Sequence, residues 1–216
     1  MEETLTYIGF AIFFFPLIVG LIRFRQLSSG QRLLVYFICF VIVNSVAAEI
    51  VGQVYGNNLI LYHLFTFVEF FVLVYLFRRS MRRIPTIVFA VPAIIFTVVG
   101  VWSVVTEPFE LPDLSRIVES VILISFSLLF FYSALRYLEV QKIERTFNFW
   151  ISGGVLLDFT GNLLLDAFGN YIAQTSDHVY YTVWTIHTIF NMILYPLYGV
   201  ALLCKDPTPP SSQSSS

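Results

Sequence analysis

The chain has 216 residues, of which 57% are hydrophobic, 18% aromatic and only 12% charged, with a formal net charge of −2. Soluble domains carry about 25% charged residues, so this composition leaves too little polar surface for a globule in water and indicates lipid as the solvent. It also contains no basic patch with interleaved aromatic residues, so we expect no nucleic-acid partner. Cys39 and Cys204 lack the Cys-x-x-Cys spacing of a thiolate metal site, and nothing indicates a cofactor.

Seven apolar runs follow one another along the chain. Each is long enough for the hydrocarbon of a bilayer, which takes about 20 mainly apolar residues to cross. They are residues 4–23, 33–55, 58–78, 84–105, 114–137, 147–168 and 179–203. The short break at Gly56–Asn58 predicts a tight hairpin between the second and third helices. The acidic start, Met1–Glu3, lacks the positive charge of a secretory signal, so we interpret the first run as a retained helix.

The basic residues are distributed on alternate loops. Of the 12 Lys and Arg residues, 11 lie in the first, third and fifth loops or after the seventh helix, and only Arg116 falls on the other side. Cytoplasmic loops carry the Lys/Arg excess. The sequence therefore predicts an all-α, polytopic bundle of seven transmembrane helices in the inner (plasma) membrane, with the N-terminus outside. Residues 1–205 form this domain, and the Pro/Ser-rich residues 206–216 are predicted to be a disordered cytoplasmic tail.

Polar side chains inside the predicted spans are the candidate site, because ionisable groups in lipid usually face the bundle interior or water. They are Glu49 of the second helix, His63 and Glu69 of the third, Glu119 of the fifth, Asp158, Asn162 and Asp166 of the sixth, and His187 and Asn191 of the seventh. Helical spacing places those of each helix on one stripe or close to it. Nearly all lie between the middle and the outer surface, so we predict a polar, partly acidic pocket that opens outward between these five helices.

A structural interpretation stands beside the functional one for most of these residues. Asn162 and Asn191 are of the type that hydrogen-bonds between membrane helices, and His187 can bond a carboxylate across the bundle. Partial hydration near the surface can satisfy Glu49, His63 and Asp166. Glu69 and Asp158 lie too deep for hydration, so we expect each to have a functional or an obligatorily paired role.

Three segments resemble a known group of proteins. They are Tyr62–Glu69, Phe149–Leu163 and Trp184–Tyr195. Together they resemble an uncharacterised bacterial seven-helix membrane family and are similar to the N-terminal membrane regions of some sensor histidine kinases. The resemblance implies a sensory role. Because no kinase portion is present, it also implies that a partner receives the signal.

Other seven-helix classes fit less well. Microbial rhodopsins carry a lysine in the last helix, and residues 179–203 contain none. Small sugar carriers share the predicted topology, but no Pro-Gln pair occurs in the first or fifth helix. Intramembrane zinc hydrolases place His-x-x-x-His on the last helix, where this chain has His187 and Asn191.

Three hypotheses of function remain open. The leading one is a non-enzymatic sensory or signalling module that binds a small or lipidic ligand in the outward pocket and acts on a cytoplasmic or membrane partner, with or without forming a homo-oligomer. The alternative is a proton-coupled transporter of small solutes in which Glu69 and Asp158 titrate. The third is an intramembrane metal-dependent hydrolase, with His63, His187 and Asp158 as metal ligands.

Overall fold

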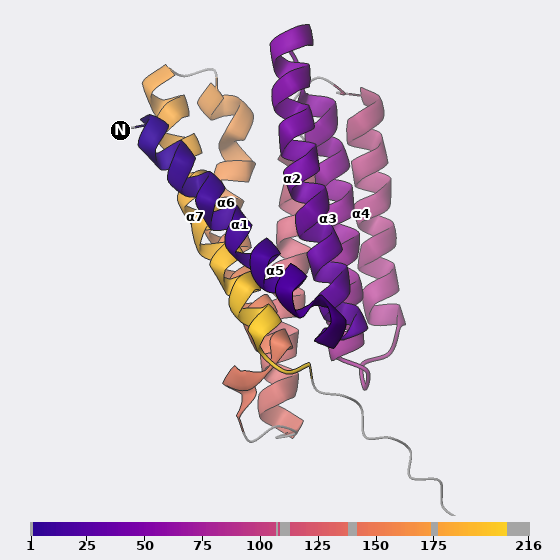
Figure 1. Cartoon of the computed structure of the whole chain (residues 1–216). Coiled ribbons are helices and arrows are strands. Elements are labelled where there is room, and N and C mark those ends of the chain that lie inside the picture. Colours follow the sequence, from indigo (N-terminus) through magenta and orange to yellow (C-terminus); the bar gives the residue numbers. More distant parts are fainter. Residues whose placement is uncertain (1, 107, 109–112, 138–141, 174–176, 207–216) are drawn as a thin grey trace, which may run out of the picture.

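A computed structural model of the chain shows an all-helical bundle (Figure 1). The structure describes residues 2–106, 108, 113–137, 142–173 and 177–206, with the side chains of these residues other than 2–11, 13, 113, 137, 164 and 166–184. The elements, with η for short 3-10 helices, are α1 (Glu2–Arg23), η1 (Phe24–Gln26), α2 (Ser29–Tyr55), α3 (Leu59–Ser80), α4 (Ile87–Thr106), α5 (Asp113–Tyr137), η2 (Ile143–Arg145), α6 (Phe147–Ala173) and α7 (Asp177–Leu203).

The seven predicted helices are confirmed, each within a few residues of its predicted ends. By length and composition, five helical segments among the described residues can cross a membrane. They are Ser29–Tyr55, Leu59–Ser80, Ile87–Thr106, Leu114–Arg136 and Thr185–Leu203. The chain is therefore a helical membrane protein. Membrane crossing by α1 and α6, and the orientation, stay predictions.

Local chemistry explains where the second and third helices begin and end. The Ser28 side chain accepts a hydrogen bond from the Gln31 backbone N–H, and the Gln31 side chain accepts one from the Ser28 N–H, a capping box that starts α2. Gly56 ends α2 with φ of 72°, a left-handed conformation that favours glycine. Asn58 then donates to the Ala48 carbonyl at 3.0 Å, which confirms the predicted tight hairpin.

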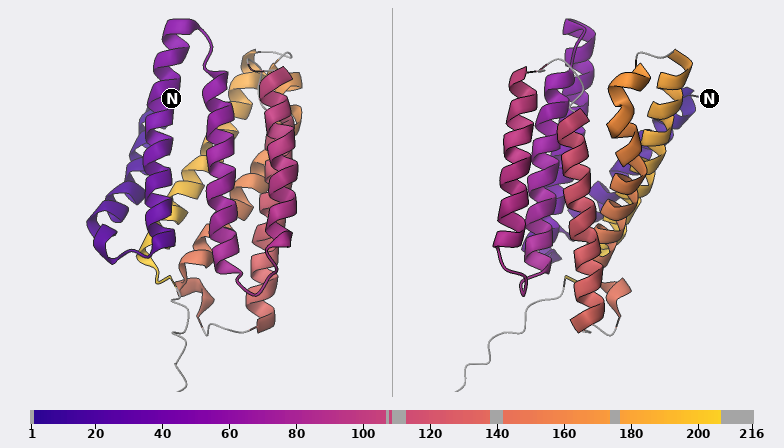
Figure 2. Two further views of the ribbon diagram at one scale, coloured as in Figure 1. Left: turned by 90° about the vertical axis from the view of Figure 1, so that its right-hand side faces the viewer. Right: turned by 180° about the vertical axis from the view of Figure 1, so that it is seen from behind.

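The helices form two groups joined through α5. Figure 2 shows α2, α3 and α4 side by side, with α6, α7 and α1 in the second group. The α5 helix contacts α3 and α4 on one side and α6 on the other, while α1 lies between α7 and α2. We call the end of the bundle that carries Arg23, Arg79, Arg136 and Lys205 the basic end. Both groups meet there.

Aromatic and aliphatic side chains fill the half of the bundle nearer the basic end. Phe70 of α3 stacks on Phe96 of α4 with ring centroids 3.8 Å apart. The Phe126 ring of α5 packs between Phe77 and Phe89, at 6.0 Å and 5.0 Å. All five rings are buried. This apolar layer lies between the two polar regions described below.

Glycines allow the closest helix contacts. A Cβ atom added at Gly161 of α6 would lie 2.3 Å from the ring of Phe190 on α7. One added at Gly100 of α4 would lie 2.6 Å from the Phe67 ring of α3. Small residues at helix interfaces let membrane helices pack without a side chain between them. The aromatic ring in each pair therefore covers the backbone of the neighbouring helix.

Candidate functional site

A buried charged network lies between α3 and α5. The guanidinium of Arg116 donates to Glu69 of α3 at 3.1 Å and to Glu119 of its own helix at 3.3 Å. The Glu69 and Glu119 side chains are 5% and 0% exposed, and that of Arg116 is 14% exposed. The two carboxylates offset the cost of placing the guanidinium inside the bundle, and it offsets theirs. The pairing also ties α5 to α3.

The network extends to α6 and α7. Arg116 lies over the Phe159 ring of α6, 5.9 Å from its centroid. On the same helix, Asn162 donates from Nδ2 to Oδ1 of Asp158 at 3.0 Å, and both residues are buried. The buried Tyr195 side chain of α7 interacts electrostatically with Glu69, Asp158 and Arg116. Four helices therefore meet around one set of charges, which we call the charged network.

Two buried polar atoms beside the network have no hydrogen-bond partner among the described residues. They are Oδ1 of Asn162 and the hydroxyl of Tyr198. Tyr198 is fully buried and interacts electrostatically with Glu69, Asp158 and Glu119. Buried polar atoms are normally paired, and each exception calls for an explanation. These two atoms are therefore candidate contacts for a ligand.

The predicted site residues separate into two sets. His63 is buried on α3 with Glu69, and Glu119, Asp158 and Asn162 are buried as well, so the structure brings these five to the interior. Their shared interior location arises because α3, α5 and α6 turn their polar faces toward one another. These buried polar groups lie on α3, α5 and α6 near Tyr195 of α7, and the outward-opening pocket stays a prediction.

The second helix does not wall this region as predicted. Glu49 is exposed and accepts a hydrogen bond from the exposed Gln53 side chain at 2.7 Å. The buried face of α2 is instead the apolar stripe that includes Leu34, Ile38 and Val41. A helix can turn only one face inward, and burying the apolar stripe turns the acidic one outward.

The seventh-helix candidates bond each other. The Asn191 side chain lies 2.9 Å from Nδ1 of His187 on the same helix and also donates to the His187 carbonyl at 3.1 Å. Both residues are partly buried. The side chain of Asp166 lies outside the described residues. Among the side chains that the structure does describe, no group of three or more His, Cys, Asp or Glu is placed to hold a metal ion.

Arg116 is a candidate site residue that was not predicted from the sequence. It appeared only as the one basic residue on the outer side of the predicted orientation. Its position three residues before Glu119 was an available signal, because residues at i and i+3 are neighbours on a helix. The second partner, Glu69, is 47 residues away in sequence, so only the packing of α3 against α5 reveals it.

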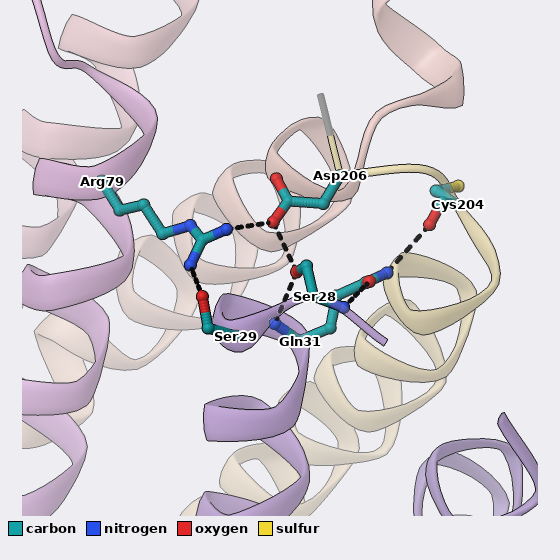
Figure 3. A network of polar contacts seen from close by, with 6 residues as sticks. All are labelled: Ser28, Ser29, Gln31, Arg79, Cys204 and Asp206. Carbon is teal, nitrogen blue, oxygen red and sulfur yellow. Dashed lines mark hydrogen bonds and ion pairs between the residues drawn. The ribbon is translucent and has the colours of Figure 1, made fainter. Parts of the chain in front are cut away.

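A second polar cluster, which we call the clamp, holds the end of α7 at the basic end (Figure 3). Asp206 pairs with Arg79 of α3 at 2.9 Å and accepts a hydrogen bond from Ser28, the N-cap of α2. Gln31 of α2 donates to the Cys204 carbonyl at 2.9 Å. The segment that follows α7 is therefore fastened to the first turn of α2 and the last turn of α3.

Further contacts complete the clamp. Arg23, at the end of α1, donates to the Leu203 carbonyl at 2.8 Å. The Phe147 N–H at the start of α6 donates to the Lys205 carbonyl at 3.1 Å. Asp206, which the sequence assigned to the disordered tail, is thus part of the folded bundle, and residues 207–216 lie outside the described part of the chain.

Cys204 offers a chemical readout of the clamp. Burial raises the pKa of the Cys204 thiol, while Trp150 and Arg23 lower it to a smaller extent. Thiolate is the reactive form, so in a Cys39→Ser background we expect slow alkylation at neutral pH that accelerates as pH rises through the raised pKa. Arg79→Gln should open the clamp and increase the neutral-pH rate severalfold, as measured by mass spectrometry after timed exposure to iodoacetamide.

The Arg79→Gln variant distinguishes opening of the clamp from the effect of removing a positive charge near the Cys204 thiol. Removing a positive charge near a thiol would by itself disfavour the thiolate and slow the reaction, whereas opening the clamp accelerates it. Asp206→Asn should also accelerate alkylation, and Glu144→Gln, an exposed change at the same end, should leave the rate unchanged. A slower reaction in Arg79→Gln than in the wild type would show that the clamp does not control access.

Fold and site together define a helical membrane protein with a charged network inside its bundle and a polar clamp at its basic end. No protein-family model matches the sequence, and neither any curated protein nor any solved structure does.

Proposed function

We propose that this protein is a sensory or signalling module of a bacterial plasma membrane. All seven helices span the bilayer, the N-terminus lies outside and the basic end faces the cytoplasm, because Lys and Arg are concentrated on the cytoplasmic side of membrane proteins. The observation that carries the proposal is the charged network around Arg116, which is buried inside the bundle and shares α3 and α7 with the clamp. The network receives the signal and the clamp transmits it.

The coupling is carried by the packed layer between the two polar regions. Ion pairs hold α3 to α5 on one side of this layer, and Asp206 fastens the end of α7 to α3 on the other. Packed interiors have low compressibility and transmit strain. A ligand that changes the charge balance at Glu69 therefore shifts α3 relative to α7 and alters the clamp, where exposed arginines such as Arg82 can contact a partner.

Spin-label distances test this coupling without knowledge of the ligand. Labels at Arg82→Cys, in the turn after α3, and Glu144→Cys, in η2 before α6, report the separation of the two groups at the basic end, in a chain whose native cysteines are replaced by serine. The protein is placed in nanodiscs of phosphatidylcholine and phosphatidylglycerol. We expect Glu69→Gln, a change in the network, to shift the distance distribution measured by double electron–electron resonance.

The matched control is Glu49→Gln, which makes the same chemical change at an exposed glutamate of α2. It should leave the distribution of the wild type unchanged. Identical distributions in the wild type and Glu69→Gln would contradict the coupling and, with it, the sensory proposal.

A proton-coupled transporter of small solutes is the second candidate. Burial of both Glu69 and Asp158 around the same tyrosine favours it, because intramembrane carboxyls commonly form proton relays in transporters. Proteoliposomes with an imposed pH gradient would decide between the two. Solute uptake that requires the gradient and is abolished by Glu69→Gln would replace the sensory proposal.

A further inference from the structure

The charged network contains more acidic groups than its single guanidinium can compensate. Glu69, Glu119 and Asp158 surround Tyr195 and Tyr198, together with Arg116. The other 11 basic side chains of the sequence belong to the loops and helix ends of the basic end. If all three carboxyls were ionised, their three negative charges would exceed the single positive charge of Arg116 by two. Unbalanced charge is costly away from water, so the network needs a further positive charge.

The amide of Asn162 indicates where that charge goes. Its Nδ2 donates to Oδ1 of Asp158 at 3.0 Å, whereas its Oδ1, an acceptor, is buried and has no partner among the described residues. Asn162 is 1% exposed. An ionised carboxylate has no proton to donate, but a protonated one has an O–H. A proton on Oδ2 of Asp158 would therefore supply the donor that Oδ1 of Asn162 lacks.

We propose that Asp158 and Asn162 form a proton-binding site, with the proton carried by Asp158 and the acid and the amide each donating one hydrogen bond to the other. The inference rests on the proposed function in one respect, since it makes the proton the signal that the module senses. A proton needs no room beyond the carboxyl oxygen that takes it, which suits side chains as closely packed as these. No covalent step other than proton transfer is involved.

Groups on every helix packed against α6 act on this site. Glu69 lies at the junction from α3, Arg116 and Glu119 from α5, and Tyr195 and Tyr198 from α7, and His63 is buried on α3 as well. Each ionised glutamate raises the free energy of a negative charge on Asp158, and Arg116 lowers it. Two glutamates pair directly with Arg116, so the guanidinium is shared. The surrounding charges therefore favour a proton on Asp158 over a further negative charge.

Infrared difference spectroscopy of the full chain in lipid detects the proton directly. A protonated carboxyl has a C=O stretching band that is distinct from the carboxylate bands and shifts in D2O. We expect the wild type to show such a band, to lose it as pH rises, and to lack it in Asp158→Asn. Glu49→Gln, at the exposed glutamate of α2, should retain the band in full. An acid band that Asp158→Asn leaves unchanged at every pH would overturn the proposal.

Two further measurements keep the test decisive if Asp158→Asn does not fold. Aspartate labelled with ¹³C at the side-chain carboxyl shifts the band in the wild-type protein only if an aspartate carries the proton. Asn162→Leu keeps Asp158 but removes its hydrogen-bonding partner, so the acid band should move towards the frequency of an acid without such a bond. A band that responds to neither change would place the proton on another group.

The outcome separates this inference from the sensory proposal. The spin-label distances between positions 82 and 144 are measured over the same pH range. An acid band assigned to Asp158 with no pH-dependent change in distance would uphold the proton site and contradict sensing by it. A distance change in Glu69→Gln without an acid band on Asp158 would uphold the sensor and exclude the proton site.

Discussion

Replacing Arg116 with methionine is expected to destabilise the bundle by about 3–5 kcal/mol, the cost of breaking a buried ion pair by removing one partner. The reason is that Glu69 and Glu119, both buried, would be left without the guanidinium that lies 3.1 Å and 3.3 Å from them. Reversible unfolding in mixed micelles with increasing sodium dodecyl sulfate measures this loss of free energy.

Compensating substitutions test the cause of that loss. Arg116→Met combined with Glu69→Gln and Glu119→Gln removes the charges on both sides, so we expect it to be clearly more stable than Arg116→Met alone. Arg116→Lys keeps the charge but replaces the planar guanidinium, whose Nη1 donates to both carboxylates, with a compact ammonium group, and it should fall in between. If the triple variant is no more stable than Arg116→Met alone, the ion pairs do not account for the effect.

Gly161→Ala is expected to have the second large effect, a loss of about 1–3 kcal/mol from overpacking. The added methyl would lie 2.3 Å from the ring of Phe190, so α6 and α7 or the ring itself would have to move. Gly153→Ala on the same helix is the matched control, because nothing lies within 4 Å of the added atom. Alanine is about 1 kcal/mol better than glycine inside a helix, so this control should be neutral or stabilising.

A double variant assigns the effect of Gly161→Ala to its contact with Phe190. With Phe190→Ala the ring is absent, and adding Gly161→Ala should then cost little or nothing, as measured by the same unfolding assay. An equal loss with and without the ring would show that the close approach of α6 and α7 is not the reason for the glycine. Because Gly161 adjoins Asn162, the variant also reports how firmly α6 is held beside the charged network.

The helices, their ends and the half of the bundle that carries the charges were predictable from the sequence. Long apolar runs, the turn at Gly56 and the distribution of arginines act over a few residues, or along one helix, and so appear in the chain directly. The same local reasoning identified Glu69 and Asp158 as deep polar groups, since depth follows from position within a span.

Which helix faces meet was decided by the tertiary structure alone. The acidic stripe of α2 is as regular as that of α6, yet Glu49 is exposed whereas Asp158 is buried. The partner of Arg116 on α3 and the contact between Asp206 and Arg79 join residues 47 and 127 positions apart. Periodicity determines which residues share a face, but the choice of face depends on how all seven helices pack together. No single helix carries that information in its own sequence.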